Sequence, residues 1–173
     1  EFDGEDVVML LAESEMEEAL AFAPELSDSS NVLLTSTALL TPAIRLKNFP
    51  KVLIHEPLLP VRSLMAIRVR IHRAQRRITF TESLFDSQKK NFDLILTLFS
   101  GAKGDVTFDG ANSIDSLDNE SSHENLFNAL NSNGKILLFT HINLLSSTNF
   151  VRYRSQWINR KLVESVCSFE GIK

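Results

Sequence analysis

The run from Phe92 to Leu98 constrains the fold most, because its unbroken apolar centre, Leu94-Ile95-Leu96, places apolar side chains on both faces of a strand. It reads FDLILTL, with Asp93 and Thr97 as its polar residues. A strand with one solvated face alternates apolar and polar side chains, whereas an unbroken apolar run is typical of a strand covered on both faces. We therefore predict that residues 92–98 form an inner strand of a sheet that lies between layers of helices.

Strand-like and helix-like patterns alternate along the chain. The patterns predict strands over residues 32–37, 51–55, 78–81, 92–98, 135–140 and 162–168, and helices over 7–23, 38–46, 61–74, 124–130 and 150–159. Such alternation predicts an α/β domain with a mainly parallel central sheet and helices on both faces. In the helix over 61–74, we expect Leu64, Met65, Ile67 and Ile71 to be buried.

Composition and length favour one domain. The 173 residues, 43% hydrophobic and 23% charged, are enough for a single core. The single Cys167 excludes an internal disulfide and a cysteine-based zinc site, and it fits the cytoplasm, where we expect the protein. No apolar run approaches the roughly 20 residues that cross a bilayer, so we expect no membrane contact. Because no Met begins the chain, we interpret residues 1–173 as a fragment of a larger protein, with a long flexible loop over residues 101–122.

Charge is distributed unevenly along the chain, whose net charge is −4. Residues 1–30 hold ten acidic residues and no basic one, while residues 41–77 hold nine basic residues and one acid, Glu56. This asymmetry fits nucleic-acid binding, contact between the two blocks, or two solvated faces. The negative net charge favours a protein partner over DNA, which stays possible. The residues expected to contact either one are Arg62, Arg70, Arg73, Arg76 and Arg77. We expect Arg62, Arg70 and Arg73 to face water.

Four segments, in order, resemble the adenine-N6 DNA methyltransferases found in type I restriction-modification systems. They are NVLLTSTALL, KVLIHEPLLPVRSLMAIRVRIH, RITFTESLFDSQKKNFDLIL and the region from residue 129 to residue 172. The resemblance implies a Rossmann-like S-adenosylmethionine-methyltransferase fold. It also matches Glu56 to the acid that binds the ribose hydroxyls of the cofactor, and Glu82 to the acid near the adenine.

The chain departs from that family at two places. Where the family has a catalytic N-P-P-F or D-P-P-Y, this chain has Leu98, Phe99, Ser100 and Gly101. None of these side chains can accept a hydrogen bond from an exocyclic amine as Asn or Asp would. The segment NVLLTSTALL lacks glycine, which elsewhere lets the backbone approach the cofactor. We therefore expect no catalytic residue, no cofactor, and a collapsed pocket with Leu39 and Leu40 at its mouth.

These features favour a non-catalytic, methyltransferase-like recognition or assembly module, a pseudoenzyme. Two alternatives stay open: an active S-adenosylmethionine-dependent DNA adenine methyltransferase, and a cofactor-free nucleic-acid-binding module. We predict no metal site, because the four histidines lie far apart and form no H-E-x-x-H pattern. His55 and His141 each follow a predicted strand, so we expect both at the carboxyl edge of the sheet.

Overall fold

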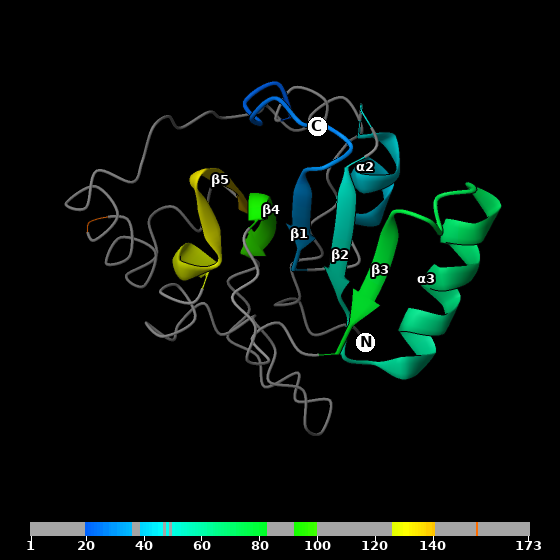
Figure 1. Cartoon of the computed structure of the whole chain (residues 1–173). Coiled ribbons are helices and arrows are strands. Elements are labelled where there is room, and N and C mark those ends of the chain that lie inside the picture. Colours follow the sequence, from blue (N-terminus) through cyan, green and yellow to red (C-terminus); the bar gives the residue numbers. More distant parts are fainter. Residues whose placement is uncertain are drawn as a thin grey trace, which may run out of the picture.

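A computed structural model of the chain describes residues 20–35, 39–46, 48, 50–82, 92–99, 126–140 and 155. Its elements are β1 (Asn31–Leu34), α2 (Leu40–Arg45), β2 (Lys51–His55), α3 (Leu59–Ile71), β3 (Ile78–Thr81), β4 (Phe92–Phe99) and β5 (Leu130–Thr140), as Figure 1 shows. The helices predicted over 7–23 and 150–159 fall largely outside the described residues. The loop predicted over 101–122 and the strand predicted over 162–168 fall outside them entirely.

The five described strands form one sheet in the order β3-β2-β1-β4-β5, and every neighbouring pair is parallel. This confirms the predicted parallel α/β architecture. The chain winds from β1 outward through β2 to β3 and then crosses back to place β4 on the other side of β1 (Figure 1). The carboxyl ends of the strands therefore lie at one edge of the sheet, and the direction of winding reverses between β1 and β4.

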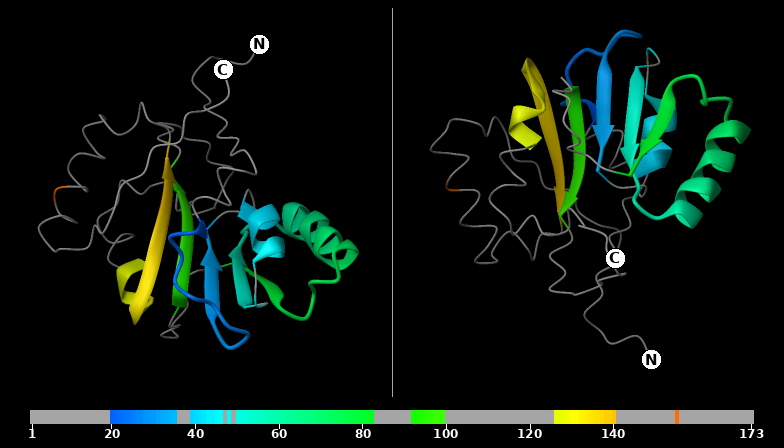
Figure 2. Two further views of the ribbon diagram at one scale, coloured as in Figure 1. Left: turned by 90° about the horizontal axis from the view of Figure 1, so that it is seen from above. Right: turned by 60° about the horizontal axis from the view of Figure 1, so that its bottom comes forward.

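Alternate side chains of the strands enter two apolar clusters on opposite faces of the sheet. On one face, Val32 and Leu34 belong to a cluster that includes residues of α2 and α3. Figure 2 shows these two helices gathered beside β2 and β3. On the other face, Leu33 and Ile95 pack with Leu126, which lies in a short helical turn before β5. Helical residues thus cover both faces. β1 and β4 are both inner strands, which confirms the prediction made for residues 92–98.

The sequence of α3 explains both of its ends. Pro60 stands in the first turn, where a missing N–H costs nothing. At the other end the N–H of Ala74 donates to the carbonyl of Val69 at 3.0 Å, and the N–H of Arg73 donates to that of Arg70 at 2.9 Å. These two bonds are the Schellman pattern that ends many helices. Arg73 has a φ of 54°, in the left-handed region that glycine favours.

The orientation of α3 differs from the prediction. The sequence predicts that Leu64, Ile67 and Ile71 are buried, but all three are exposed. Val69 is buried and Met65 partly buried, so these two side chains form the inner face. The prediction was wrong because α3 carries apolar residues at helical spacing on two faces, and spacing alone does not select the face that meets the sheet.

β5 begins earlier than predicted. The sequence predicts a helix up to Leu130 and a strand from Lys135, whereas β5 already starts at Leu130. The N–H of Phe92 donates to the carbonyl of Ala129 at 2.8 Å, which ties the start of β4 to the start of β5. Gly134 permits this close approach, because a Cβ there would lie 2.6 Å from the carbonyl oxygen of Phe92.

Candidate functional site

The carboxyl edge of the sheet beside β1 is the best-placed region for a ligand. In open parallel sheets, ligands bind outside the carboxyl ends of the strands where the winding reverses, here between β1 and β4. Thr35 follows β1, and its N–H donates to the carbonyl of Leu96 at 3.1 Å. Its hydroxyl donates to Oγ1 of Thr97 at 2.8 Å in a buried setting. These contacts fix the ends of β1 and β4 relative to each other.

Glu56 follows β2 directly and therefore lies at this edge. Its N–H donates to the carbonyl of Thr81 at 2.9 Å, which extends the pairing of β2 with β3. Its Oε1 accepts a hydrogen bond from the N–H of Leu58 at 2.9 Å, just before α3. The residue is only 8% exposed. The backbone thus holds a buried carboxylate in one orientation, and a carboxylate so held can accept hydrogen bonds from hydroxyl groups.

Glu82, after β3, brings a second acid to the same edge. Its backbone carbonyl lies 3.2 Å from Nε2 of His55, which is at the edge as predicted. Its Oε1 accepts a hydrogen bond from Nη2 of Arg62 at 2.7 Å. The prediction that Arg62 faces water is wrong, because the side chain of Arg62 is 16% exposed, against 72% for Glu82. The structure therefore groups Glu56, Glu82, His55 and Arg62 at one edge of the sheet.

The remaining candidate arginines divide into two kinds. Those exposed at or beyond the end of α3 are Arg70, Arg73 and Arg76. Arg77, by contrast, is partly buried, and its guanidinium donates to the carbonyl of Ala43 at 3.0 Å and to that of Ile44. Burial lowers the pKa of the Arg77 guanidinium below its ordinary value. Arg77 thus binds the last carbonyls of α2, a role that a count of charges does not reveal.

Leu39 and Leu40 are not at the mouth of a pocket. They are fully buried and belong to the same apolar cluster as Val69 of α3. Leu40 is the first residue of α2, and its side chain turns inward because that helix buries its apolar face against the sheet. The predicted placement was wrong for this reason, and the two leucines give no ground for a blocked cofactor site.

The four positions that replace the catalytic motif of the resemblance lie only partly in the described structure. Leu98 and Phe99 are the last residues of β4, so this segment starts at the carboxyl edge. Ser100, Gly101 and His141 lie outside the described residues. Within the described ranges, no group of His, Cys, Asp and Glu side chains could hold a metal ion. Of the described helices, none combines the length and the apolar character that a membrane span requires.

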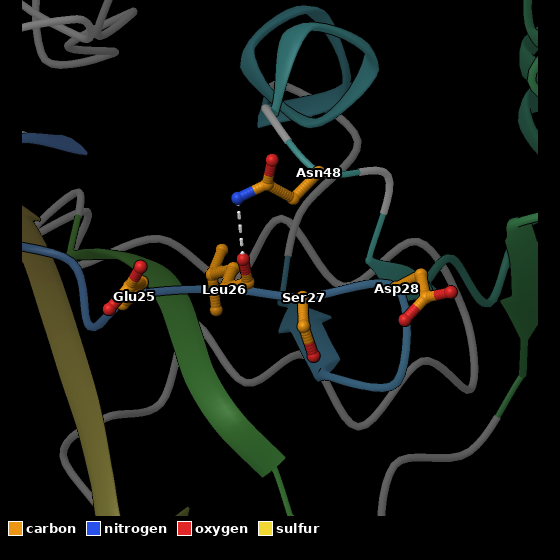
Figure 3. Close-up of a pocket in the computed structure, with 5 residues that line it drawn as sticks. All are labelled: Glu25, Leu26, Ser27, Asp28 and Asn48. Carbon is orange, nitrogen blue, oxygen red and sulfur yellow. Dashed lines mark hydrogen bonds between the residues drawn. The ribbon is translucent and has the colours of Figure 1, made fainter.

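An open hollow of about 530 Å³ lies at the opposite edge, before β1 (Figure 3). Its lining residues are Glu25, Leu26, Ser27, Asp28 and Asn48. The amide of Asn48 donates to the carbonyl of Leu26 at 2.8 Å and closes one side. Sequence reasoning did not single out this hollow, whose signal is only the serine-rich turn before β1. Because it opens at the amino ends of the strands, we assign the candidate site to the carboxyl edge.

Comparison with known proteins bears on the fold. No protein-family model and no curated protein matches the sequence. The structure is similar to precorrin-6y C5,15-methyltransferase from Geobacter metallireducens, with a TM-score of 0.60 and 14% identity over 87% of this chain and 72% of that one. It is similar to StiE O-MT, with a TM-score of 0.51 and 17% identity over 73% and 43% of the two chains. It is also similar to coclaurine N-methyltransferase bound to N-methylheliamine and SAH, with a TM-score of 0.50 and 12% identity over 72% and 34%.

The chain has the Rossmann-like fold of S-adenosylmethionine-dependent methyltransferases. The predicted fold is thereby confirmed. The expectation of no cofactor is wrong, because this is a cofactor-binding fold, and the coclaurine enzyme was solved with SAH, S-adenosylhomocysteine. That expectation rested on the missing glycine in NVLLTSTALL and on the replaced catalytic motif at residues 98–101. The similar proteins are C-, O- and N-methyltransferases, so they support the fold and not the adenine-N6 DNA family. The chain spans about a third of the coclaurine enzyme.

Proposed function

We propose that this chain binds S-adenosylmethionine at the carboxyl edge of its sheet, with Glu56 as the acceptor for the ribose hydroxyls. The observation that carries the proposal is the buried Glu56 carboxylate, which directly follows β2, the strand next to β1. Its Oε1 accepts a hydrogen bond from the N–H of Leu58 at 2.9 Å, which fixes its orientation. A ribose diol offers two hydroxyl donors, and an oriented carboxylate can accept from both. The fold supports this class of ligand, since the similar coclaurine N-methyltransferase is bound to SAH.

Glu82 is the second group that we assign to this site. It follows β3, and the resemblance matches it to the acid near the adenine of the cofactor. Arg62 orients the Glu82 carboxylate through the contact of 2.7 Å between Nη2 and Oε1. Because Glu82 is largely exposed, this ion pair itself stabilises the fold by only about 0–1 kcal/mol.

We further propose that the chain does not methylate the N6 amine of adenine. That reaction uses a side chain that accepts a hydrogen bond from the exocyclic amine, and the segment Leu98-Phe99-Ser100-Gly101 supplies neither Asn nor Asp. The domain then serves recognition or assembly within a larger protein. S-Adenosylmethionine is a bound ligand in this proposal, and not a methyl donor to DNA.

Isothermal titration calorimetry of the 173-residue chain with S-adenosylmethionine and SAH tests the binding proposal. Glu56→Gln keeps the size of the side chain and an oxygen for the N–H of Leu58, but it removes the charge. Hydrogen bonds to charged groups contribute about 1.5–3 kcal/mol, so we expect the affinity of Glu56→Gln to fall about tenfold or more. Glu25→Gln is the matched control, because Glu25 lines the hollow at the opposite edge. Its affinity should equal that of the wild type.

The outcomes separate the candidate functions. Equal affinity in Glu56→Gln and wild type would place the site elsewhere, and no binding by the wild type would contradict the proposal. With tritiated S-adenosylmethionine and duplex DNA, we expect no methyl incorporation above background. Incorporation that Glu56→Gln abolishes would establish the active DNA methyltransferase instead. Salt-sensitive DNA binding without any cofactor binding would favour the nucleic-acid-binding module.

A further inference from the structure

The outer face of α3 carries an apolar stripe bordered by arginines. Leu64, Ile67 and Ile71 are 61%, 57% and 73% exposed. They are three and four residues apart, so they form one continuous row along the helix, which we call the α3 stripe. By helical geometry Arg68 lies on one side of the row and Arg70 on the other. In Figure 1, α3 lies at the outside of the molecule, beside β3.

The α3 stripe belongs neither to the core nor to the candidate ligand site. The opposite face of α3 supplies Met65 and Val69 to the apolar cluster, and Arg62 pairs with Glu82 at the carboxyl edge. Single exposed apolar residues are ordinary on protein surfaces, whereas a contiguous row with a polar rim marks an interaction site. A partner that fits the α3 stripe should therefore cover its aliphatic side chains with apolar ones and place acidic side chains beside the bordering arginines.

Charge and side-chain type select among the occupants. A second copy that paired α3 against α3 would set arginines against arginines, since the helix sequence LPVRSLMAIRVRI contains no acid. Single-stranded nucleic acid stacks on aromatic side chains, of which this helix has none. An acidic amphipathic helix meets both needs, because its apolar side covers the row and its acids face the arginines.

Residues 1–19 of this chain have the required composition. They contain eight acidic residues and no basic one. At helical spacing, one side of residues 8–19 carries Val8, Ala12, Met16 and Ala19. Glu13 and Glu15 border this side, while Glu17 and Glu18 lie farther round the helix. The pattern is thus the complement of the α3 stripe, with a central apolar row and charges of opposite sign at its borders.

The position of the next residue places this segment on the correct side of the sheet. Leu20 packs against the same apolar cluster as Met65 and Val69, the inner residues of α3. The 13 residues of α3 extend about 20 Å, and 19 residues in a helix would extend about 28 Å, which suffices to cover the row. We propose that residues 1–19 dock on the α3 stripe of the same chain.

Hydrogen exchange of the full chain, followed by mass spectrometry, tests this docking. The variant Ile67→Glu/Ile71→Glu places two carboxylates in the row, where they would face the acidic segment. We expect amides of residues 1–19 to exchange about tenfold faster than in the wild type, while those of β1 and β4 keep their rates. The control Gln75→Glu/Asn133→Glu adds the same charge at two exposed positions away from the row. It should leave residues 1–19 unchanged.

Three results would overturn the proposal. Equal exchange of residues 1–19 in the wild type and in Ile67→Glu/Ile71→Glu would show that the row does not hold them. Protection that disappears on dilution of the wild type would show that the segment docks on a second copy. Binding of the wild type to vesicles of phosphatidylserine and phosphatidylcholine, lost in the same variant, would identify a membrane surface as the occupant.

Discussion

Replacement of Gly134 by alanine tests the close approach of β4 and β5. The added Cβ would lie 2.6 Å from the carbonyl oxygen of Phe92 and 2.9 Å from Cδ2 of Leu130. The leucine side chain can rotate away, but the carbonyl belongs to the backbone of β4. Because the N–H of Phe92 is bonded to the carbonyl of Ala129 at 2.8 Å, moving this peptide would disturb the pairing of the two strands.

Two opposing effects set the size of the change in stability. Overpacking of a close contact costs about 1–3 kcal/mol. Alanine also restricts the unfolded chain, which stabilises the protein by about 0.4–1 kcal/mol where the native backbone accepts it. The φ of Gly134 lies outside the left-handed region, so only the steric term opposes that gain. We expect a net loss of about 1–2 kcal/mol, or a fall in Tm of about 2–8 °C for a chain of this length.

Urea unfolding of the full chain, followed by circular dichroism, measures this loss. Asn133→Ala is the control, because the neighbouring Asn133 is exposed and its replacement should change the free energy of unfolding by less than about 0.5 kcal/mol. Adding Leu130→Ala to Gly134→Ala should not restore stability, since the contact with Phe92 persists. A Gly134→Ala variant more stable than the wild type would refute the reasoning, because only the effect on the unfolded chain would then remain.

Three further variants test other contacts by the same unfolding measurement. Thr97→Val leaves the buried hydroxyl of Thr35 without its acceptor and should cost about 1–3 kcal/mol; an unchanged midpoint would contradict that contact. Arg77→Met keeps the apolar stem but removes the bonds to the end of α2, and should cost about 1–2 kcal/mol. Arg73→Gly should stabilise by up to about 1 kcal/mol, because the residue is left-handed. Destabilisation by Arg73→Gly would contradict the Schellman ending of α3.

Much of the sheet could be predicted from the sequence. β2 and β3 have the predicted bounds, because each is a short apolar or β-branched run between polar or proline-containing segments. The inner position of β4 follows from its apolar run Leu94-Ile95-Leu96, which places apolar side chains on both faces of the strand. The places of Glu56 and His55 at the carboxyl edge follow from their position directly after, or at the end of, a parallel strand.

The features that escaped prediction depend on contacts between segments distant in sequence. The inward face of α3 is set by the shape of the sheet it meets, and not by its own two apolar rows. The sequence shows Arg62 and Arg77 only as two positive charges, without their partners. In the structure, Arg62 pairs with Glu82, and Arg77 donates to a carbonyl near the end of α2. The prediction of no cofactor was wrong. The absence of glycine describes the composition of NVLLTSTALL, but it does not reveal that the side chains of Leu39 and Leu40 pack into the apolar core.

A titration of the ¹⁵N-labelled chain with SAH, followed by two-dimensional NMR, tests the central claim most directly. The claim is that the ligand binds at the carboxyl edge beside Glu56, and not in the hollow at the amino edge. We predict that the amide signals of Thr35, Glu56 and Glu82 shift with increasing SAH, while those of Asp28 and Asn48 stay in place. Shifts confined to Asp28 and Asn48, or no shift at saturating SAH, would contradict the account.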